Sequence, residues 1–261
     1  MTDRQLAILE QLNQFETVSV TELAQQLQTA GATIRKDLVS LEEQGLLRRQ
    51  HGGAKRVSRR DVGYRMIFEY DIKKRIADRA AQMVSHGETI MIESGSTCAM
   101  LAEVLAKTRH DVTIITNSAF ISGHIRMIPG IRIILLGGTY DPEAQVMTGP
   151  LARMCAETFH VDKFFIGTDG YCPDQGFYNE DISRADTVRS MAKQATNRII
   201  LTTAQKFNRR SDVLLMPEKD VSMIITDEVP DNCRKKLETS GVEIVLAEAS
   251  NAKVSKIGFI E

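Results

Sequence analysis

The sequence predicts an α/β protein in two parts, a small helical domain closed by a basic hairpin and a larger domain built on a largely parallel sheet. The first sixty residues carry apolar side chains at helical spacing, followed by a Gly-Gly turn between basic segments. After residue 85, short apolar runs alternate with helical segments. We expect one domain over 1–58, a linker and lead-in helix over 59–84, and a second domain over 85–261.

The N-terminal domain should contain three helices and a hairpin. Apolar residues from Leu6 to Phe15 recur at helical spacing, Thr21 is of a type that caps helices, and Gly45 is a good helix stop. The expected elements are a helix over 4–15, an extended segment over 18–20, a helix over 21–28, a helix over 32–44 and two extended pieces around the turn His51-Gly52-Gly53. This order is that of a winged helix-turn-helix.

The helix over 32–44 has the pattern of a recognition helix. Ile34, Leu38 and Leu41 share one face and should pack inward. Three other side chains project near its N-terminus, namely Thr33, Arg35 and Lys36. Arginine can bind guanine O6 and N7 together, and threonine can reach a base or a thymine methyl. The alternative is an ordinary surface helix with solvated charges, but the three-helix spacing and the hairpin favour DNA binding.

A basic stripe accompanies the hairpin, although the whole chain has a net charge of −1. Between Leu46 and Arg60 there are six basic side chains and no acidic one. Such residues suit phosphates, which set affinity and register rather than sequence choice. The predicted DNA-binding residues are Thr21, Thr33, Arg35, Lys36, Arg48, Arg49, His51, Lys55 and Arg56.

The N-terminal segment resembles the DeoR family of bacterial transcription regulators. The stretch VSVTELAQQLQTAGATIRKDLVSLEEQGLLRRQHGGA contains the family's V-S-V-x-E-L-A opening, T-I-R-[RK]-D-L helix and R-x-H-G-G-A ending. Ala30-Gly31 stand where many members have Ser and an acidic residue, so the helix is capped by Thr29 or has a looser start. The T-x-G-x-T-I-R-K-D-L run is also similar to that of glucitol-operon-type repressors.

The second domain should contain a largely parallel sheet covered on both faces. Its apolar runs alternate with helices, which is typical of βαβ units. The expected strands are 89–94, 112–117, 131–137, 162–169, 198–203 and 221–227, and one helix over 64–84 should lead into them.

Small and polar residues follow five of these strands, where ligands of open α/β sheets bind. Ser94–Thr97 should expose backbone N–H groups to a phosphate at a helix N-terminus, Glu93 and Asp169 suit sugar hydroxyls, and Lys206 supplies positive charge. The predicted effector-binding residues are Glu93, Ser94, Gly95, Ser96, Thr97, Asn117, Ser118, Gly137, Gly138, Gly167, Thr168, Asp169, Gly170 and Lys206. Taken singly, Gly137-Gly138 is more often a turn and Asn117-Ser118 more often a helix cap.

The family resemblance extends over about residues 3–250, through ESGST, TNS, LGG, DKFFIGTDG and TAQKF. It implies a sugar-phosphate-sensing domain similar in fold to ribose-5-phosphate isomerase. Two departures bear on the ligand. Glu93 replaces the usual Asp, and Thr203 stands where many members have the Asp of D-x-S-K-F.

An isomerase-like enzyme is the alternative function. Carboxylates that could serve as its base are Glu93, Asp169, Glu180 and Asp181. The isomerase motifs D-G-A-D-E and K-G-G-G are absent from the sequence, and a catalyst has no evident use for a winged helix. We therefore expect a regulator rather than an enzyme.

The remaining expectations concern partners and location. The four cysteines form no C-x-x-C pair, the five histidines have no ligand spacing, and no apolar run reaches membrane-spanning length. We expect a cytoplasmic homo-oligomer without metal, cofactor or membrane contact. It should bind double-stranded operator DNA under control of a phosphorylated sugar or sugar alcohol, most simply as a repressor of a carbohydrate-utilisation operon. Dimer or tetramer, repression or activation, and the identity of the sugar stay open.

Overall fold

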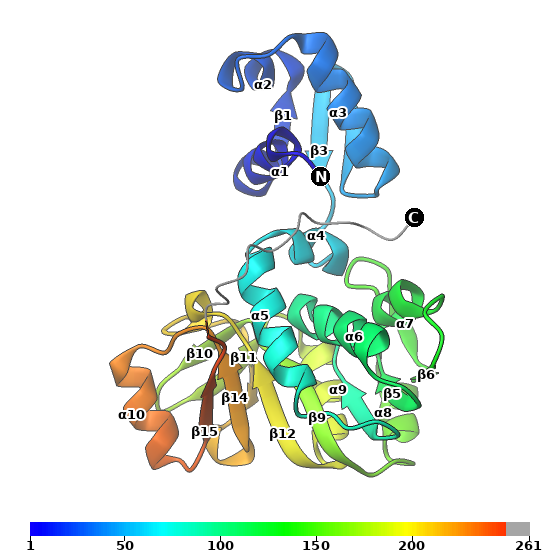
Figure 1. Ribbon diagram of the computed structural model, residues 1–261. Coiled ribbons are helices and arrows are strands. Elements are labelled where there is room, and N and C mark those ends of the chain that lie inside the picture. Colours follow the sequence, from blue (N-terminus) through cyan, green and yellow to red (C-terminus); the bar gives the residue numbers. More distant parts are fainter. Residues whose placement is uncertain (249–261) are drawn as a thin grey trace. The chain divides into compact units, whose positions relative to one another are not determined.

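The computed structural model describes residues 1–248, which divide into two compact units at the peptide bond between Phe68 and Glu69 (Figure 1). This division falls inside the segment 59–84 that was expected to link two domains. Residues 249–261, which end the predicted second domain, lie outside the described residues.

The N-terminal unit is a winged helix-turn-helix, as the sequence predicted. Its elements are α1 (Asp3–Phe15), β1 (Thr17–Ser19), α2 (Val20–Gln26), α3 (Gly31–Glu43), β2 (Leu47–Gln50), β3 (Gly53–Arg56) and α4 (Val62–Ile67). The three strands form an antiparallel sheet in the order β1-β3-β2. Ile34, Leu38 and Leu41 of α3 are buried with apolar residues of α1, which confirms the inward face predicted for this helix.

The start of α2 differs from the prediction. Thr21 does not cap this helix but lies exposed inside its first turn. Ser19 is the cap, because its hydroxyl accepts a hydrogen bond from the Glu22 N–H and the Glu22 carboxylate accepts one from the Ser19 N–H. The spacing S-x-x-E of Ser19 and Glu22 is a capping box, which the sequence contains and the prediction overlooked.

Glycines shape the turn of the hairpin and the end of α3. Gly45 follows α3 with φ +72°, and Gly52 occupies the turn between β2 and β3 with φ +74°. Both values lie in the left-handed region, which is unfavourable for residues that have a Cβ. Gly53 has a different reason. A Cβ there would lie 2.1 Å from the carbonyl oxygen of Val18, so only glycine lets β3 approach β1 this closely.

The second unit contains a seven-stranded sheet in which every neighbouring pair is parallel. The order is β15-β14-β12-β9-β4-β5-β6. The strands are β4 (Thr89–Ile92), β5 (Val112–Thr116), β6 (Ile131–Leu135), β9 (Val161–Gly167), β12 (Ala195–Leu201), β14 (Met223–Thr226) and β15 (Glu243–Leu246). Six of them lie within or overlap the predicted strands, and β15 was not predicted.

Helices cover both faces of this sheet (Figure 1). They are α5 (Tyr70–Ala81), α6 (Ser96–Thr108), α7 (Ala119–Ile125), α8 (Pro150–Ala156), α9 (Ile182–Ala192) and α10 (Asp231–Thr239), with 3-10 turns η1 (Ala204–Lys206) and η2 (Glu218–Asp220). Phe164 and Ile166 of β9 pack into one core cluster with α9 and α10. Phe165 between them is buried on the other face, because successive strand residues point in opposite directions.

Five short strands were not predicted. They are β7 (Thr139–Asp141) paired with β8 (Val146–Thr148), and a small antiparallel sheet of β10 (Gly170–Cys172), β11 (Gly176–Asn179) and β13 (Val213–Met216). Each has three or four residues, which is too short for a periodic signal.

The single helix predicted over 64–84 is wrong. The segment forms α4 and α5 separated by Phe68 and Glu69, and Glu69 has the left-handed φ of +55°. Phe68 stays with the N-terminal unit, where its ring packs edge-on against Tyr64 with centroids 5.1 Å apart. The Tyr64 hydroxyl donates to the carbonyl of Leu9, which fixes α4 to α1.

Candidate DNA-binding surface and effector site

The exposed start of α3 presents two cations, Arg35 and Lys36. Arg35 and Lys36 are exposed, and neither has a hydrogen bond or ion pair with another described residue. Ala30 precedes the helix without a side-chain cap, so the looser start holds and Thr29 does not cap it. The first N–H groups of α3 therefore stay available to phosphate oxygens.

A partly buried ion pair fixes α3 to α1. Asp37 is 7% exposed, and its carboxylate accepts hydrogen bonds from the Arg4 guanidinium at 2.5 and 3.3 Å. Asp37 is therefore buried, whereas its neighbours Arg35 and Lys36 are exposed. Sequence reasoning missed this contact, which joins residues 33 positions apart.

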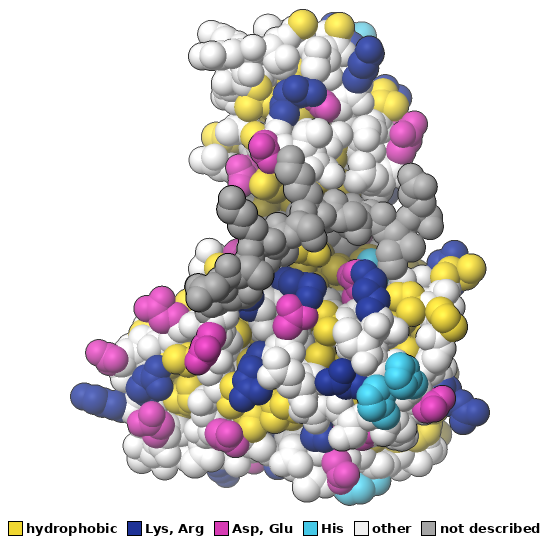
Figure 2. All heavy atoms as spheres, in the orientation of Figure 1, with side chains coloured by type: hydrophobic (Ala, Val, Ile, Leu, Met, Phe, Trp, Pro, Cys, Tyr) yellow, Lys and Arg dark blue, Asp and Glu magenta, His cyan; other side chains and the backbone are white. Residues whose placement is uncertain are grey.

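The hairpin of β2 and β3 is the wing of the winged helix. Three of its predicted DNA-binding cations have partners inside the protein. Arg49 forms an ion pair with Glu42 at 2.6 Å, Lys55 lies 3.3 Å from Glu16, and Arg56 donates to the carbonyl of Asn13 at 3.2 Å. Figure 2 shows Lys and Arg side chains of this unit interspersed with Asp and Glu. Both ion pairs are largely exposed, and exposed pairs contribute little to stability, so these cations can exchange to phosphates.

A groove of about 480 Å³ runs between the recognition helix and the wing. Its lining residues are Val20, Arg35, Leu38, Arg49, Gln50, His51, Gly52 and Gly53. Three of the predicted DNA-binding residues, Arg35, Arg49 and His51, therefore share one concave surface. The others occupy nearby elements, with Thr21 on α2, Thr33 and Lys36 on α3, Arg48 on β2, and Lys55 and Arg56 on β3.

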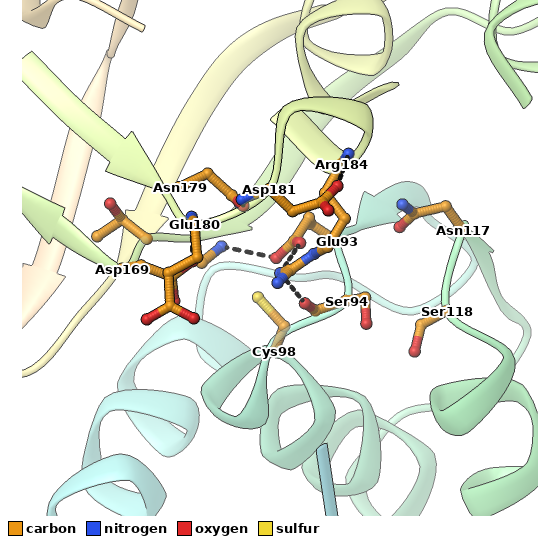
Figure 3. Close-up of polar contacts among 12 residues, drawn as sticks. Glu93, Ser94, Cys98, Asn117, Ser118, Asp169, Asn179, Glu180, Asp181 and Arg184 are labelled. Carbon is orange, nitrogen blue, oxygen red and sulfur yellow. Dashed lines mark hydrogen bonds and ion pairs between the residues drawn. The ribbon is translucent and has the colours of Figure 1, made fainter. Parts of the chain in front are cut away.

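At the carboxyl edge of the parallel sheet, β4 runs through Glu93, Ser94 and Gly95 into α6 (Figure 3). Gly95 is the N-cap and offers no side-chain cap to this 13-residue helix. The first turn of α6, which begins with Ser96 and Thr97, therefore has no side-chain cap, and the helix dipole favours an anion there. Two later helices differ, since Ser118 caps α7 and Asp181 caps α9 through their side chains, whereas α8 and α10 also lack a side-chain cap.

Glu93 and Arg184 form a buried ion pair beside this turn. Nη2 of Arg184 lies 2.9 Å from Oε1 of Glu93 and 2.9 Å from the carbonyl oxygen of Ser94, while Oε2 of Glu93 accepts from the N–H of Gly167 at 3.2 Å. The Arg184 side chain is 4% exposed and the Glu93 side chain is 1% exposed. Both Glu93 oxygens thus have protein donors, so this carboxylate orders the strand ends.

Charge interactions decide the ionisation of this pair. Burial alone lowers the pKa of Arg184, but the carboxylates of Glu93 and Asp169 outweigh it and raise the pKa above its ordinary value. Burial raises the pKa of Glu93, and the Arg184 guanidinium opposes that rise. The sequence did not indicate Arg184, because this residue belongs to no motif and lies 91 positions from Glu93.

Two predicted glycines make room for this pair. A Cβ on Gly167 would lie 3.0 Å from Oε2 of Glu93, and one on Gly95 would lie 3.2 Å from the same atom. These positions therefore serve the contact between the ends of β4 and β9. The predicted Gly138 likewise packs closely, since a Cβ there would lie 2.6 Å from the carbonyl oxygen of Thr148.

The end of β5 contributes one unsatisfied polar atom. Ser118 is occupied as the cap of α7 and accepts from the Ile121 N–H. Asn117 is fully buried, and its Nδ2 lies 3.4 Å from the carbonyl oxygen of Met147. Its Oδ1 is buried without a hydrogen-bond partner among the described residues, so an acceptor is available beside the turn.

The ends of β9 and β12 complete the predicted set. The Thr168 hydroxyl donates to backbone carbonyls in the small sheet, and Asp169 is 3% exposed and accepts from the Glu180 N–H at 3.1 Å. Thr203 lies next to the 3-10 turn that contains Lys206, and its hydroxyl donates to Oε2 of Glu69 at 3.2 Å. Glu69 was not among the predicted residues.

Fold and surfaces together define a DNA-binding transcriptional regulator with a separate α/β unit. The sequence comparisons agree, because the DeoR-like helix-turn-helix domain matches residues 4–60 and the DeoR C terminal sensor domain matches residues 69–228. The chain belongs to the DeoR family. It is therefore a regulator and not an isomerase-like enzyme.

Named relatives align over nearly the whole chain. A putative aga operon transcriptional repressor of Escherichia coli O157:H7 is 28% identical over 94% of this chain and 93% of its own length. The transcriptional repressor AccR of Agrobacterium fabrum is 30% identical over 90% and 95%. An L-fucose operon activator of Haemophilus influenzae is 27% identical over 94% and 100%.

Among solved structures, the chain is similar to ribose-5-phosphate isomerases at low identity. One in complex with phospho-erythronic acid has 17% identity and a TM-score of 0.39, covering 53% of this chain and 54% of that one. The enzyme from Neisseria gonorrhoeae has 19% identity and a TM-score of 0.39, covering 54% and 55%. No helix among residues 1–248 is long and apolar enough to cross a membrane.

Proposed function

We propose that the protein represses a carbohydrate-utilisation operon in the cytoplasm and that a phosphorylated sugar or sugar alcohol controls its affinity for operator DNA. The observation that carries the effector is the first turn of α6, whose N–H groups have no side-chain cap at the carboxyl edge of a parallel sheet. The unpartnered Oδ1 of Asn117 beside it suits a ligand hydroxyl. Relatives named for sugar operons support the same class of effector.

Specificity for the operator is assigned to the start of α3. Arg35 is exposed, has no ion pair within residues 1–248, and lines the groove beside the wing. The wing cations are assigned to phosphates. We further propose a homo-oligomer, because two winged helices one helical turn apart, about 34–36 Å, read a symmetric operator.

Arg35→Ala tests the recognition helix, with Lys55→Ala as its control on the wing. Arg35→Ala should weaken binding to the operator by about 1–3 kcal/mol and relax the base preference at one position. Lys55→Ala should weaken all sequences alike and reduce the salt slope by about one. Fluorescence anisotropy over a salt series measures both. Uniform weakening by Arg35→Ala would contradict the assignment.

A further inference from the structure

Glu69 is the first residue of the second unit, which we call the sensor unit, and its carboxylate contacts Thr203 just after the end of β12. Oε2 accepts a hydrogen bond from the Thr203 hydroxyl at 3.2 Å, while Oε1 is buried without a hydrogen-bond partner among the described residues. A carboxylate oxygen removed from water needs a donor, and leaving it without one costs free energy. The unfilled acceptor therefore marks a place for a donor group.

The backbone of Glu69 is also unfavourable. Its φ of +55° is in the left-handed region, which costs energy for a residue with a long side chain, and its side chain does not cap α5. Strained backbone of this kind tends to occur at ligand sites. Two unfavourable features thus coincide at one residue at the ligand-binding edge of the sheet.

The spacing of the strands relates Glu69 to the phosphate position proposed on α6. Strand β12 lies two positions from β4 in the sheet, with β9 between them. Because neighbouring strands lie about 4.8 Å apart, the end of β12 is about 10 Å from the end of β4. A ligand with its phosphate at α6 would extend its other end toward Thr203. A carboxylate there would repel a phosphate and accept a hydrogen bond from a hydroxyl.

Glu69 also adjoins the DNA-binding unit along the chain. Phe68 packs against Tyr64 in the core of that unit, and Glu69 contacts Thr203 in the other. One peptide bond joins the two residues. A ligand that engages Glu69 thus acts on the residue at which the two units join.

We propose that Glu69 is an effector-contact residue whose free carboxylate oxygen accepts a hydrogen bond from a hydroxyl at the end of the effector remote from its phosphate. This inference rests on the proposed function and narrows it. The effector is a phosphorylated polyhydroxy compound that carries a hydroxyl donor at its far end, and Glu69 selects for that donor.

Glu69→Asn tests the assignment in the full-length protein. Asparagine tolerates the left-handed backbone but is too short to keep the carboxylate position. The matched control is Asp111→Asn, an acid-to-amide change at another left-handed residue (φ +58°), which is exposed and precedes β5 at the opposite edge of the sheet. Anisotropy on operator DNA would be followed during titration with ribose 5-phosphate, fructose 6-phosphate and glucitol 6-phosphate.

We expect Glu69→Asn to bind the operator as the wild type does. It should need at least about tenfold more of the active compound for the same response, because it loses a hydrogen bond to a charged group. Asp111→Asn should respond like the wild type. Glu69→Gln, which keeps the size of the side chain, should also lose sensitivity, because a neutral amide is the weaker acceptor.

Two results would overturn the assignment alone. One is a wild-type response in Glu69→Asn and Glu69→Gln. The other is loss of operator binding in both variants, which would make Glu69 a folding residue. A wild type that binds the operator but responds to none of the three compounds would instead overturn the proposed effector class, and the role of Glu69 with it.

Discussion

Removing Arg184 tests whether its ion pair with Glu93 holds the strand ends together. Arg184→Met keeps the bulk of the side chain but deletes two hydrogen bonds of 2.9 Å, one to Oε1 of Glu93 and one to the carbonyl of Ser94. Glu93 would keep only its bond from Gly167, and its charged form would lose the Arg184 cation in a site that is 1% exposed. Breaking a buried pair in this way costs about 3–5 kcal/mol.

Urea unfolding of the sensor unit at pH 7, followed by circular dichroism, measures this cost. The double variant Arg184→Met with Glu93→Gln should recover much of it, because it leaves no unpaired charge. The cost should also shrink in acid. Without Arg184 the pKa of Glu93 rises further above its ordinary value, so the folded state is favoured when Glu93 is protonated, and this advantage is lost as the pH rises through the folded pKa.

A loss below about 1 kcal/mol for Arg184→Met would refute the reasoning, since a pair exposed to water behaves in that way. A double variant that is less stable than the single one would refute it as well. Either result would mean that Glu93 has another partner in solution or that the site is open.

Two further predictions concern α6. A hydrogen bond from His124, together with the neighbouring Lys107, lowers the pKa of Glu103 from 4.5 to about 2. These contacts of Glu103 therefore stabilise the fold above pH 4.5, and the stabilisation is lost as the pH falls toward 2. Glu103→Gln should therefore cost about 1–2 kcal/mol at pH 7 and almost nothing near pH 2 in urea unfolding, whereas an equal cost at both pH values would contradict the pairing. Ser96→Ala with Thr97→Ala should leave operator affinity unchanged and raise the effector concentration needed by about tenfold or more, and joint loss of both activities would indicate damaged folding instead.

The sequence predicted those parts of the fold that depend on local pattern. Ile34, Leu38 and Leu41 lie on one helical face and are buried, and six strands with long apolar runs appear in the sheet. The break at Glu69 was missed because the apolar spacing continues across it. Its left-handed backbone depends on tertiary contacts that no local pattern encodes.

The candidate site was only partly predictable for the same reason. The polar strand ends are visible in the sequence because they follow apolar runs, and Ser94–Thr97 does lead into a helix without a side-chain cap. Arg184 and Glu69 reach those strand ends from elements distant in the sequence, so their roles required the topology. Gly95 and Gly167, predicted as ligand contacts, border the carboxylate of Glu93, which the sequence pattern did not indicate.

The central claim is that a phosphorylated sugar, read at the carboxyl edge of the sheet, controls DNA binding by the winged helix. Its most direct test is anisotropy of the full-length protein on the DNA upstream of its own operon, with excess random DNA, over a salt series and with pentose, hexose and hexitol phosphates. Tight, competitor-resistant binding that one compound shifts by about 5- to 150-fold is the predicted result. Specific binding that no phosphorylated compound alters would contradict the claim.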